Sequence, residues 1–285
     1  MPVDDSPRLL HLHEDHFKLA RIVERFLPIA QPTYNTLISA NHEIKVYASF
    51  KSDHEPKTEA PFVVLADFGP QIRPFCTIEA DEAPSEDRLE LGSRLIVQAL
   101  REWAQHLVKT NQSDIVVVGA VHSWWGDAIK KAFGPLVAFG QYDTHLAPPP
   151  SIALGSQVEL PAGYEFGTVR EQDIEESEAK GNESNGHDSI ILAASAFTHR
   201  DGSLGTMSVG PDFRRRGLAV LLVQERLRRE RQWEIDSGLP EPQRSIAYVG
   251  ATNAASKGVM RKSGWPVVWQ AAWCRIDLAV MQKVQ

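Results

Sequence analysis

Three consecutive arginines stand in front of a glycine in the stretch VGPDFRRRGLA, residues 209–219. Apolar runs on both sides predict a strand, a turn and then a helix that begins near Leu218. N–H groups at a helix start lack partners within the helix and bind anions, and Gly217 lets the backbone approach a ligand closely. We therefore predict a site for two linked phosphates on this turn, formed by Arg214, Arg215, Arg216, Gly217, Leu218 and Ala219.

The arginines have two interpretations. They add charge-assisted hydrogen bonds to a bound anion, or they form a solvated basic turn, like the Arg-rich segment RLRRERQ further along. The whole chain carries a net charge of −7. This balance argues against a chain-wide attraction to nucleic acid or anionic membranes, so we expect neither as a partner and predict a local anion site.

Composition narrows the class of protein further. The chain has 285 residues, 42% hydrophobic and 24% charged, which is typical of a folded protein with room for two domains. Its two cysteines, Cys76 and Cys274, lie outside any C-x-x-C spacing, so neither a disulfide framework nor a zinc site is indicated. We find no apolar leader region and no run of about 18 apolar residues, so the expected location is the cytoplasm.

Strands and helices alternate along the chain, which predicts an α/β fold with a mixed sheet. In the first half we expect helices over 13–27, 32–41, 85–108 and 123–134, and strands over 43–50, 60–68, 74–80, 114–121 and 136–142. In the second half we expect strands over 164–169, 189–197, 202–210, 245–251 and 266–278, and helices from 218 and over 254–264.

The two halves share the order long helix, buried strand, short helix and strand, so they are candidates for diverged copies of one unit. The Pro-rich segment 144–163 predicts a linker between domains at 1–143 and 164–285. The polar stretch 171–188 predicts a loop.

Three motifs carry a resemblance to a known family. R-x-x-G-x-A, beginning at Arg214, resembles the coenzyme A pyrophosphate loop of the GCN5-related N-acetyltransferase (GNAT) superfamily. The segment NAASKGVMRKSGW resembles the second motif of that superfamily and supplies Asn253, Ser256, Gly264 and Trp265. The stretch LPIAQPTYNTLISANH, residues 27–42, resembles the opening region of glycine N-acyltransferase-like proteins, which end in an FR47-like GNAT domain.

The resemblance implies a tandem GNAT-like architecture with a degenerate N-terminal half and an acyl-CoA-binding C-terminal domain. The pantetheine arm would lie between splayed strands at 203–209 and 245–251, and a backbone N–H near Val209 would polarise the thioester carbonyl. Acetyl-CoA or another acyl-CoA is then the expected co-substrate, held by the Arg214–Ala219 turn with Asn253 and Ser256. An amine attacks the thioester directly, and the reaction needs no metal.

The acid and the base depart from the family pattern. The usual proton-donating tyrosine aligns with Met260, and the glutamate base of glycine N-acyltransferases aligns with Ser203, a poor base unaided. Tyr248 and Ser256 are substitutes for the acid by position only. Beside Ser203, a base acting through water could come from His199 or Asp201. The candidate catalytic residues are therefore Val209, Tyr248, Ser203 and His199.

The N-terminal half has no phosphate loop. Its corresponding turn, EADEAPSEDRLELG at 79–92, carries carboxylates that would repel a pyrophosphate. We expect this half to be structural or to line the acceptor side of the cleft, and not to bind coenzyme A.

Three weaker signals favour structural interpretations. The histidines of HLHEDH precede an amphipathic helix and lack metal-ligand spacing, so we interpret them as solvated residues at the helix start. Cys274 lies within a predicted strand and has no triad partners, so we interpret it as a buried thiol. Trp265, Trp269 and Trp273 share one face of an extended strand and fill core or an interdomain seam, with an aromatic acyl pocket as the alternative.

The sequence thus favours an acyl-CoA-dependent N-acyltransferase acting on a small amine or amino acid, as a monomer or homodimer. A non-catalytic coenzyme A binding protein stays open, because Met260 and Ser203 replace the family's acid and base. Protein acetylation is a third possibility that no motif singles out.

Overall fold

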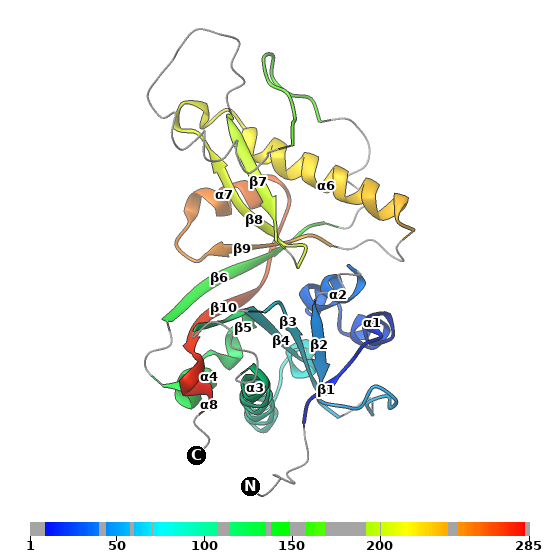
Figure 1. The fold of residues 1–285 in the computed structure, drawn as a ribbon. Helices are drawn as coiled ribbons and strands as arrows, with labels where there is room; N and C mark the ends of the chain where they lie inside the picture. Colours follow the sequence, from blue (N-terminus) through cyan, green and yellow to red (C-terminus); the bar gives the residue numbers. More distant parts are fainter. Residues whose placement is uncertain are drawn as a thin grey trace, which may run out of the picture.

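The computed structural model describes residues 9–39, 44–57, 60–69, 71–107, 115–134, 138–148, 158–168, 192–199, 201–238 and 244–282. These residues form one mixed sheet with the strand order β1-β2-β3-β4-β5-β10-β6-β9-β8-β7. Figure 1 shows two lobes, one for each half of the chain, with strands β6 and β10 crossing between them. The predicted α/β class with a mixed sheet is confirmed.

The N-terminal half supplies one end of the sheet and the helices around it. Helix α1 begins after Asp15, whose side chain accepts the Lys18 N–H, and a 3₁₀ turn leads from it to Pro28. The elements of this half are β1 (His11–Leu12), α1 (His16–Val23), α2 (Gln31–Ile38), β2 (Lys45–Ala48), β3 (Val63–Asp67), β4 (Gln71–Cys76), α3 (Glu86–Leu107), β5 (Ile115–His122), α4 (Gly126–Phe133) and β6 (Ala138–Leu146).

The C-terminal half repeats much of this order. Its elements are β7 (Ala194–Thr198), β8 (Leu204–Val209), α6 (Leu218–Asp236), β9 (Ile246–Gly250), α7 (Ala254–Lys262), β10 (Val267–Asp277) and α8 (Leu278–Gln282). In each half a long helix joins two parallel strands, β4 with β5 through α3 and β8 with β9 through α6. The repeated order and pairing support the predicted tandem architecture.

The last strand of each half is exchanged with the other. Strand β6, which follows the N-terminal half, pairs with β9, and strand β10, at the end of the chain, pairs with β5. The two exchanged strands also pair with each other over most of their length. The sheet is therefore continuous, and neither half completes its sheet alone.

The hydrophobic cores follow the same exchange. Ala272, Cys274 and Ile276 of β10 belong to the core that α3 and α4 cover, together with Trp103 and Trp125. A second core lies under α1 and α2, and a third lies under α6 and α7. Strand β10 therefore completes the hydrophobic core of the N-terminal half, although more than a hundred residues of sequence separate the two.

Two expectations are corrected by the structure, and two stay predictions. Residues 164–168, predicted as part of a strand, form no strand, because they pair with no strand in the part of the chain that the structure describes. The predicted linker begins too early, since β6 extends through Leu146 and binds β9 there. The predicted loop 171–188 lies outside the described residues, and the domain division at 1–143 and 164–285 stays a prediction.

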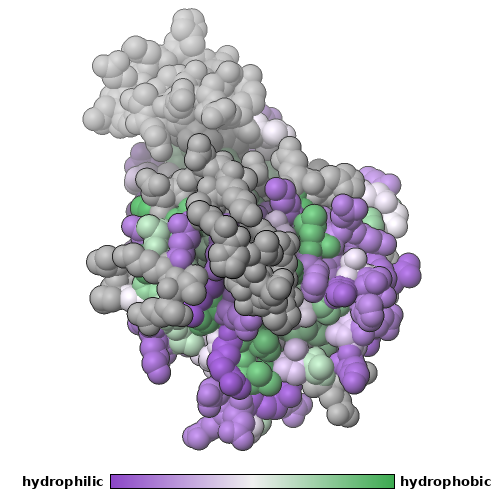
Figure 2. All heavy atoms as spheres, turned by 60° about the horizontal axis from the view of Figure 1, so that its bottom comes forward, coloured by the Kyte–Doolittle hydropathy of each residue, from purple (hydrophilic) through white to green (hydrophobic). Residues whose placement is uncertain are grey.

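Figure 2 shows the face of the N-terminal lobe, where hydrophilic side chains surround small hydrophobic patches. No helix among the described residues is long and apolar enough to cross a membrane.

Candidate functional site

The turn between β8 and α6 has the geometry of an anion site. A 3₁₀ turn at Pro211–Phe213 follows the strand, and Gly217 then precedes the helix with φ +82° and ψ −3°. The first helical bonds return to the Gly217 carbonyl from Val220 and Leu221. The N–H groups of Leu218 and Ala219 therefore point outward from the helix start, toward open space at Gly217, where an added Cβ would meet nothing within 4 Å.

The Val209 N–H faces the gap between the diverging strands β8 and β9, which we call the slot. The next residue, Gly210, donates its N–H to the Ala193 carbonyl on the β7 side at 3.0 Å. Successive N–H groups of a strand point to opposite sides, so the Val209 N–H points toward β9. The described residues pair β8 with β9 at Leu204–Ala247 alone. The strands therefore diverge toward Val209, leaving its N–H beside the opening.

The three arginines differ in what they contact. Arg214 donates from Nε to the Val209 carbonyl at 3.2 Å. Arg216 donates to the Asp212 carbonyl and to the Tyr164 hydroxyl, and its guanidinium lies over the Phe213 ring. Arg215 is exposed with a positive φ of 62°, and its side chain makes no hydrogen bond with the described residues. Two arginines thus shape the turn, and Arg215 is the most available to a ligand.

Asn253 and Ser256 form the start of α7. The Asn253 side chain accepts the Ser256 N–H at 3.0 Å and caps the helix. Both residues lie beyond the end of β9, the strand that forms the other wall of the slot. Their predicted role in cofactor binding stays a prediction.

Ser203 and the Tyr248 hydroxyl are buried, while His199 is exposed in the turn before β8. Ser203 is fully buried and donates its hydroxyl to Asp201 Oδ1 at 2.7 Å. The Tyr248 hydroxyl is buried close to the Arg73 guanidinium. Burial raises the pKa of Tyr248, and the nearby Arg73 guanidinium opposes that rise, so the phenol holds its proton at neutral pH.

Met260 and Cys274 are buried in hydrophobic clusters. Met260 packs against Trp265 and Val223 under α6 and α7, where it has no proton to give. Burial raises the pKa of the Cys274 thiol to about 12, so no thiolate nucleophile forms there near neutral pH. Among the described residues, no group of three His, Cys, Asp or Glu side chains is placed to hold a metal ion.

The turn after β4 is the N-terminal counterpart of the β8 turn. Thr77 donates its N–H to the Phe62 carbonyl at 3.1 Å, as Gly210 does to Ala193, so Cys76 occupies the place of Val209. The Cys76 N–H donates to Glu79 Oε1 at 3.0 Å, and the Trp125 indole N–H donates to the same oxygen at 2.7 Å. The Glu79 side chain thus occupies the N–H group that a ligand would need, and we call this turn closed.

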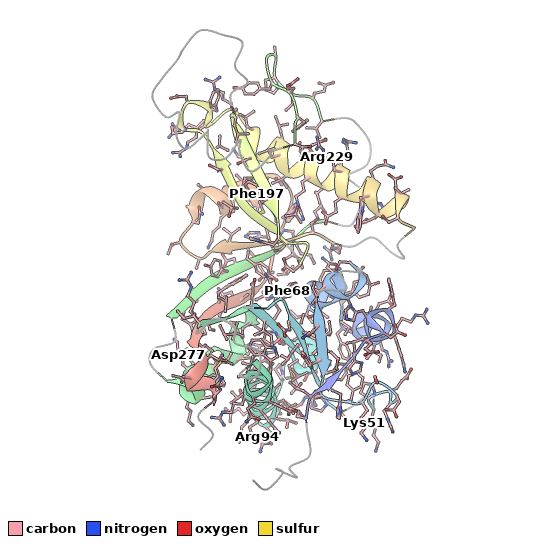
Figure 3. The ribbon with its side chains drawn as sticks, in the orientation of Figure 1. Lys51, Phe68, Arg94, Phe197, Arg229 and Asp277 are labelled. Carbon is pink, nitrogen blue, oxygen red and sulfur yellow. The ribbon has the colours of Figure 1, made fainter. Side chains whose placement is uncertain are left out.

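A groove of about 570 Å³ runs along the flank of α6, between α6, β7 and α2. Its lining includes Asn35 and Ser39 from the N-terminal half and Arg229 and Trp233 from α6. Figure 3 shows Arg229 on α6 and Phe197 on the neighbouring β7. Of the predicted site residues only His199 lines this groove. The groove is therefore separate from the turn at 214–219, which is predicted to bind phosphate and which we call the phosphate turn.

Sequence reasoning missed Arg73, a buried residue of β4. Arg73 pairs with Asp201, and its guanidinium lies 4.7 Å from the Trp273 ring centroid and 5.6 Å from that of Tyr248. Through this ion pair the structure brings Tyr248 and Ser203 into one cluster with a residue of the other half. A single arginine in the otherwise apolar strand QIRPFC was the available signal.

The chain is similar to known proteins in part of its sequence and in its fold. Residues 185–274, about a third of the chain, match the family model described as FR47-like protein. The structure is similar to that of a Drosophila protein, with a TM-score of 0.64 and 18% identity over 95% of this chain and 99% of that chain. At this identity the likeness shows the fold alone. No curated protein matches the sequence.

Two other solved structures are more distant. One is a GCN5-related N-acetyltransferase from Sphaerobacter thermophilus, with a TM-score of 0.46 and 16% identity over 95% of this chain and 96% of that chain. The other is a tandem GNAT protein from the clavulanic acid biosynthesis pathway, with a TM-score of 0.44 and 12% identity over 94% and 98%. The part of the chain that matches the FR47-like family is the part that contains β8, the phosphate turn and α6.

Proposed function

We propose that this protein transfers an acyl group from coenzyme A to the amine of a small molecule or amino acid. The observation that carries the proposal is the open turn of the C-terminal half. There the N–H groups at the start of α6 and the Val209 N–H all lie at the C-terminal end of β8 or in the turn that follows it, within the segment that matches the FR47-like family. The first group fits a pyrophosphate, and the second fits the oxyanion of a tetrahedral intermediate.

In this proposal, the protein supplies position and hydrogen bonds. The amine attacks the thioester carbonyl, the Val209 N–H stabilises the developing oxyanion, and the thiolate leaves as coenzyme A. Tyr248 is the proposed source of the proton for the thiolate. Because burial raises its pKa, it donates only with the Arg73 guanidinium beside its ring to stabilise the tyrosinate, which then regains a proton from water. The amine loses its proton to a base acting through water, for which exposed His199 is the candidate.

Thiol release from acyl-CoA tests the proposal. A panel of amines and amino acids, with glycine included because residues 27–42 resemble glycine N-acyltransferase-like proteins, should reveal acceptor-dependent release of free coenzyme A. Acetyl-CoA and a longer acyl-CoA should be compared as donors. Gly217→Glu is the control, since a carboxylate at the phosphate turn blocks the cofactor.

A second function is favoured by one observation. Met260 and Ser203, at the places of the family's acid and base, are both buried, and Ser203 is engaged with Asp201. A protein that binds coenzyme A without catalysis fits this arrangement. Tight coenzyme A binding by the wild type, with no acceptor-dependent thiol release from any panel member, would favour this second function.

A further inference from the structure

A buried ion pair joins the two halves at the closed end of the slot. Arg73 of β4 is 5% exposed, Asp201 of the turn before β8 is 2% exposed, and the guanidinium Nη1 contacts the carboxylate Oδ2. Placing two charges out of water is costly unless their geometry is fixed by further partners. The other partners of each group therefore indicate what the pair holds in place.

Asp201 holds the start of β8. Its second oxygen, Oδ1, accepts the Ser203 hydroxyl at 2.7 Å and the Ser203 N–H at 3.2 Å. The next residue, Leu204, is the one at which the described part of β8 pairs with β9. The carboxylate thus fixes the point from which the two strands diverge, and with it the width of the slot toward Val209.

Three aromatic rings surround the Arg73 guanidinium. The guanidinium carbon lies 4.7 Å from the ring centroid of Trp273, 5.6 Å from that of Tyr248 and 5.7 Å from that of Phe68. Figure 3 shows Phe68 in the middle of the molecule, between the two lobes. A cation over these ring faces is favourable and restricts how the rings can turn. The ring of Tyr248 is therefore oriented by a residue of the other half.

Buried ion pairs are in general not required for stability as such. Replacement of a buried ion pair by apolar residues of similar size is often neutral or stabilising, whereas the loss of one partner is strongly destabilising. A single hydrophobic pair at these positions would fill the same space without fixing Ser203 or the Tyr248 ring. The two charges therefore serve to hold Ser203 and the Tyr248 ring in place.

We propose that Arg73, from the N-terminal half, is a positioning residue of the acyl-transfer site. Through Asp201 and Ser203 it fixes the start of β8, and with its guanidinium it orients the Tyr248 ring. The N-terminal half is then a working part of the site, although its own slot is closed. This inference rests on the proposed function for its kinetic readout, but its structural readout is independent of turnover.

The test compares Arg73→Met, Asp201→Leu and the double variant. We expect each single variant to be less stable than wild type and the double variant to regain most of the melting temperature, because no unpaired charge is left buried. In the double variant, hydrogen–deuterium exchange of the peptide at 203–209 should be about tenfold faster than in wild type. Its kcat should be about 100-fold lower, because a small misplacement is enough for such a loss.

Two further measurements separate positioning from general damage. The dissociation constant for coenzyme A should change by less than about threefold in the double variant, because the phosphate turn lies at the other end of β8. Arg73→Lys keeps a charge beside Asp201 and should recover part of both the exchange protection and the kcat. Arg88→Met breaks the pair Arg88–Asp81 elsewhere in the same half and should leave exchange at 203–209 unchanged.

Wild-type exchange rates at 203–209 in the double variant would overturn the inference, whether or not the protein turns over. So would a double variant that regains both its stability and its kcat. A wild-type protein without acceptor-dependent thiol release would count against the proposed function alone, because exchange is measured without an acceptor.

Discussion

The two halves of this protein place the same turn at the end of the same strand, and one turn is open while the other is closed. In the C-terminal half the Val209 N–H faces a diverging slot and Gly217 leaves space before α6. In the N-terminal half the Cys76 N–H is bonded to Glu79. One fold thus gives a binding site or a filled core, depending on which side chains follow the strand.

Two further residues close the N-terminal turn. Pro74 is the preceding residue of β4 that faces β5, and as a proline it has no N–H to offer a ligand. Trp125 packs against α3 at Gly92, where an added Cβ would come within 2.5 Å of the indole ring. The acidic composition of this turn first suggested repulsion of phosphate. The structure adds that the N–H donor and the space are both taken.

The largest effect is expected for Gly217→Glu. Its positive φ disfavours any side chain, and a carboxylate at the helix start repels a pyrophosphate, so coenzyme A affinity should fall more than about 100-fold. Calorimetric titration measures this and should give one equivalent of coenzyme A per wild-type chain, because the N-terminal turn is closed. Gly134→Glu, at φ +91° and ψ 177° with open space in the N-terminal half, imposes at least as much backbone strain and should bind normally. Equal losses in both variants would contradict the phosphate-turn assignment.

Val209→Pro removes one N–H from the slot, as Pro74 does in the N-terminal half two residues before the counterpart of Val209. We expect kcat to fall about 100-fold, since the loss of one oxyanion donor has that magnitude. Coenzyme A affinity should change little, because the phosphate turn is intact. Steady-state kinetics with a matched Val209→Ala variant, which keeps the N–H, separates the donor from the side chain. A similar kcat for both variants would exclude Val209 as the donor.

Glu79→Gln tests how the closed turn is held. Burial raises the pKa of Glu79 from an ordinary value of 4.5 to about 8, so the unfolded chain loses this proton at lower pH than the folded protein. The contribution of Glu79 to stability is therefore complete below pH 4.5 and is lost as pH rises to about 8. The free energy of unfolding should fall by up to about 1.4 kcal/mol per pH unit in this window.

In Glu79→Gln that slope should be reduced, because the amide oxygen still accepts both N–H groups and does not titrate. Urea unfolding at several pH values between 5 and 8 measures the difference. Glu82→Gln, at an exposed position of the same loop, is the control and should keep the wild-type slope. If the Glu79→Gln variant also kept the wild-type slope, the Glu79 carboxyl of the wild-type protein would be ionised in the folded state.

The smallest effect is expected for Arg215→Ala. Arg215 is exposed and adds charge at the rim, while backbone N–H groups hold the ligand, so coenzyme A should bind about threefold more weakly. The loss should shrink at high salt, as expected for a screened charge. Arg94→Ala makes the same change of charge on exposed α3 and should leave the titration unchanged. A loss as large as that of Gly217→Glu would make the arginine, not the backbone, the main anion ligand.

Local patterns predicted the parts of the site that lie within one segment. Gly217 between an apolar strand and an apolar helix predicted the helix start at Leu218, which is where α6 begins. Expected strands were mostly found within a few residues of their predicted bounds, except at 164–168. The roles of Val209, Tyr248, Ser203 and His199 in catalysis stay predictions, as do those of Asn253 and Ser256 in cofactor binding.

The sequence by itself determined the alternation of elements, the helix start at Gly217 and the acidic turn at 79–92, because these depend on side chains close together along the chain. Only the tertiary structure decided that β6 and β10 exchange places, because strand pairing depends on register and on cores built from distant segments. It also decided that Arg73 meets Asp201 across the two halves and that Glu79 caps Cys76. A buried charge reveals its purpose only through its partners, and here those partners lie in another strand or in the other half.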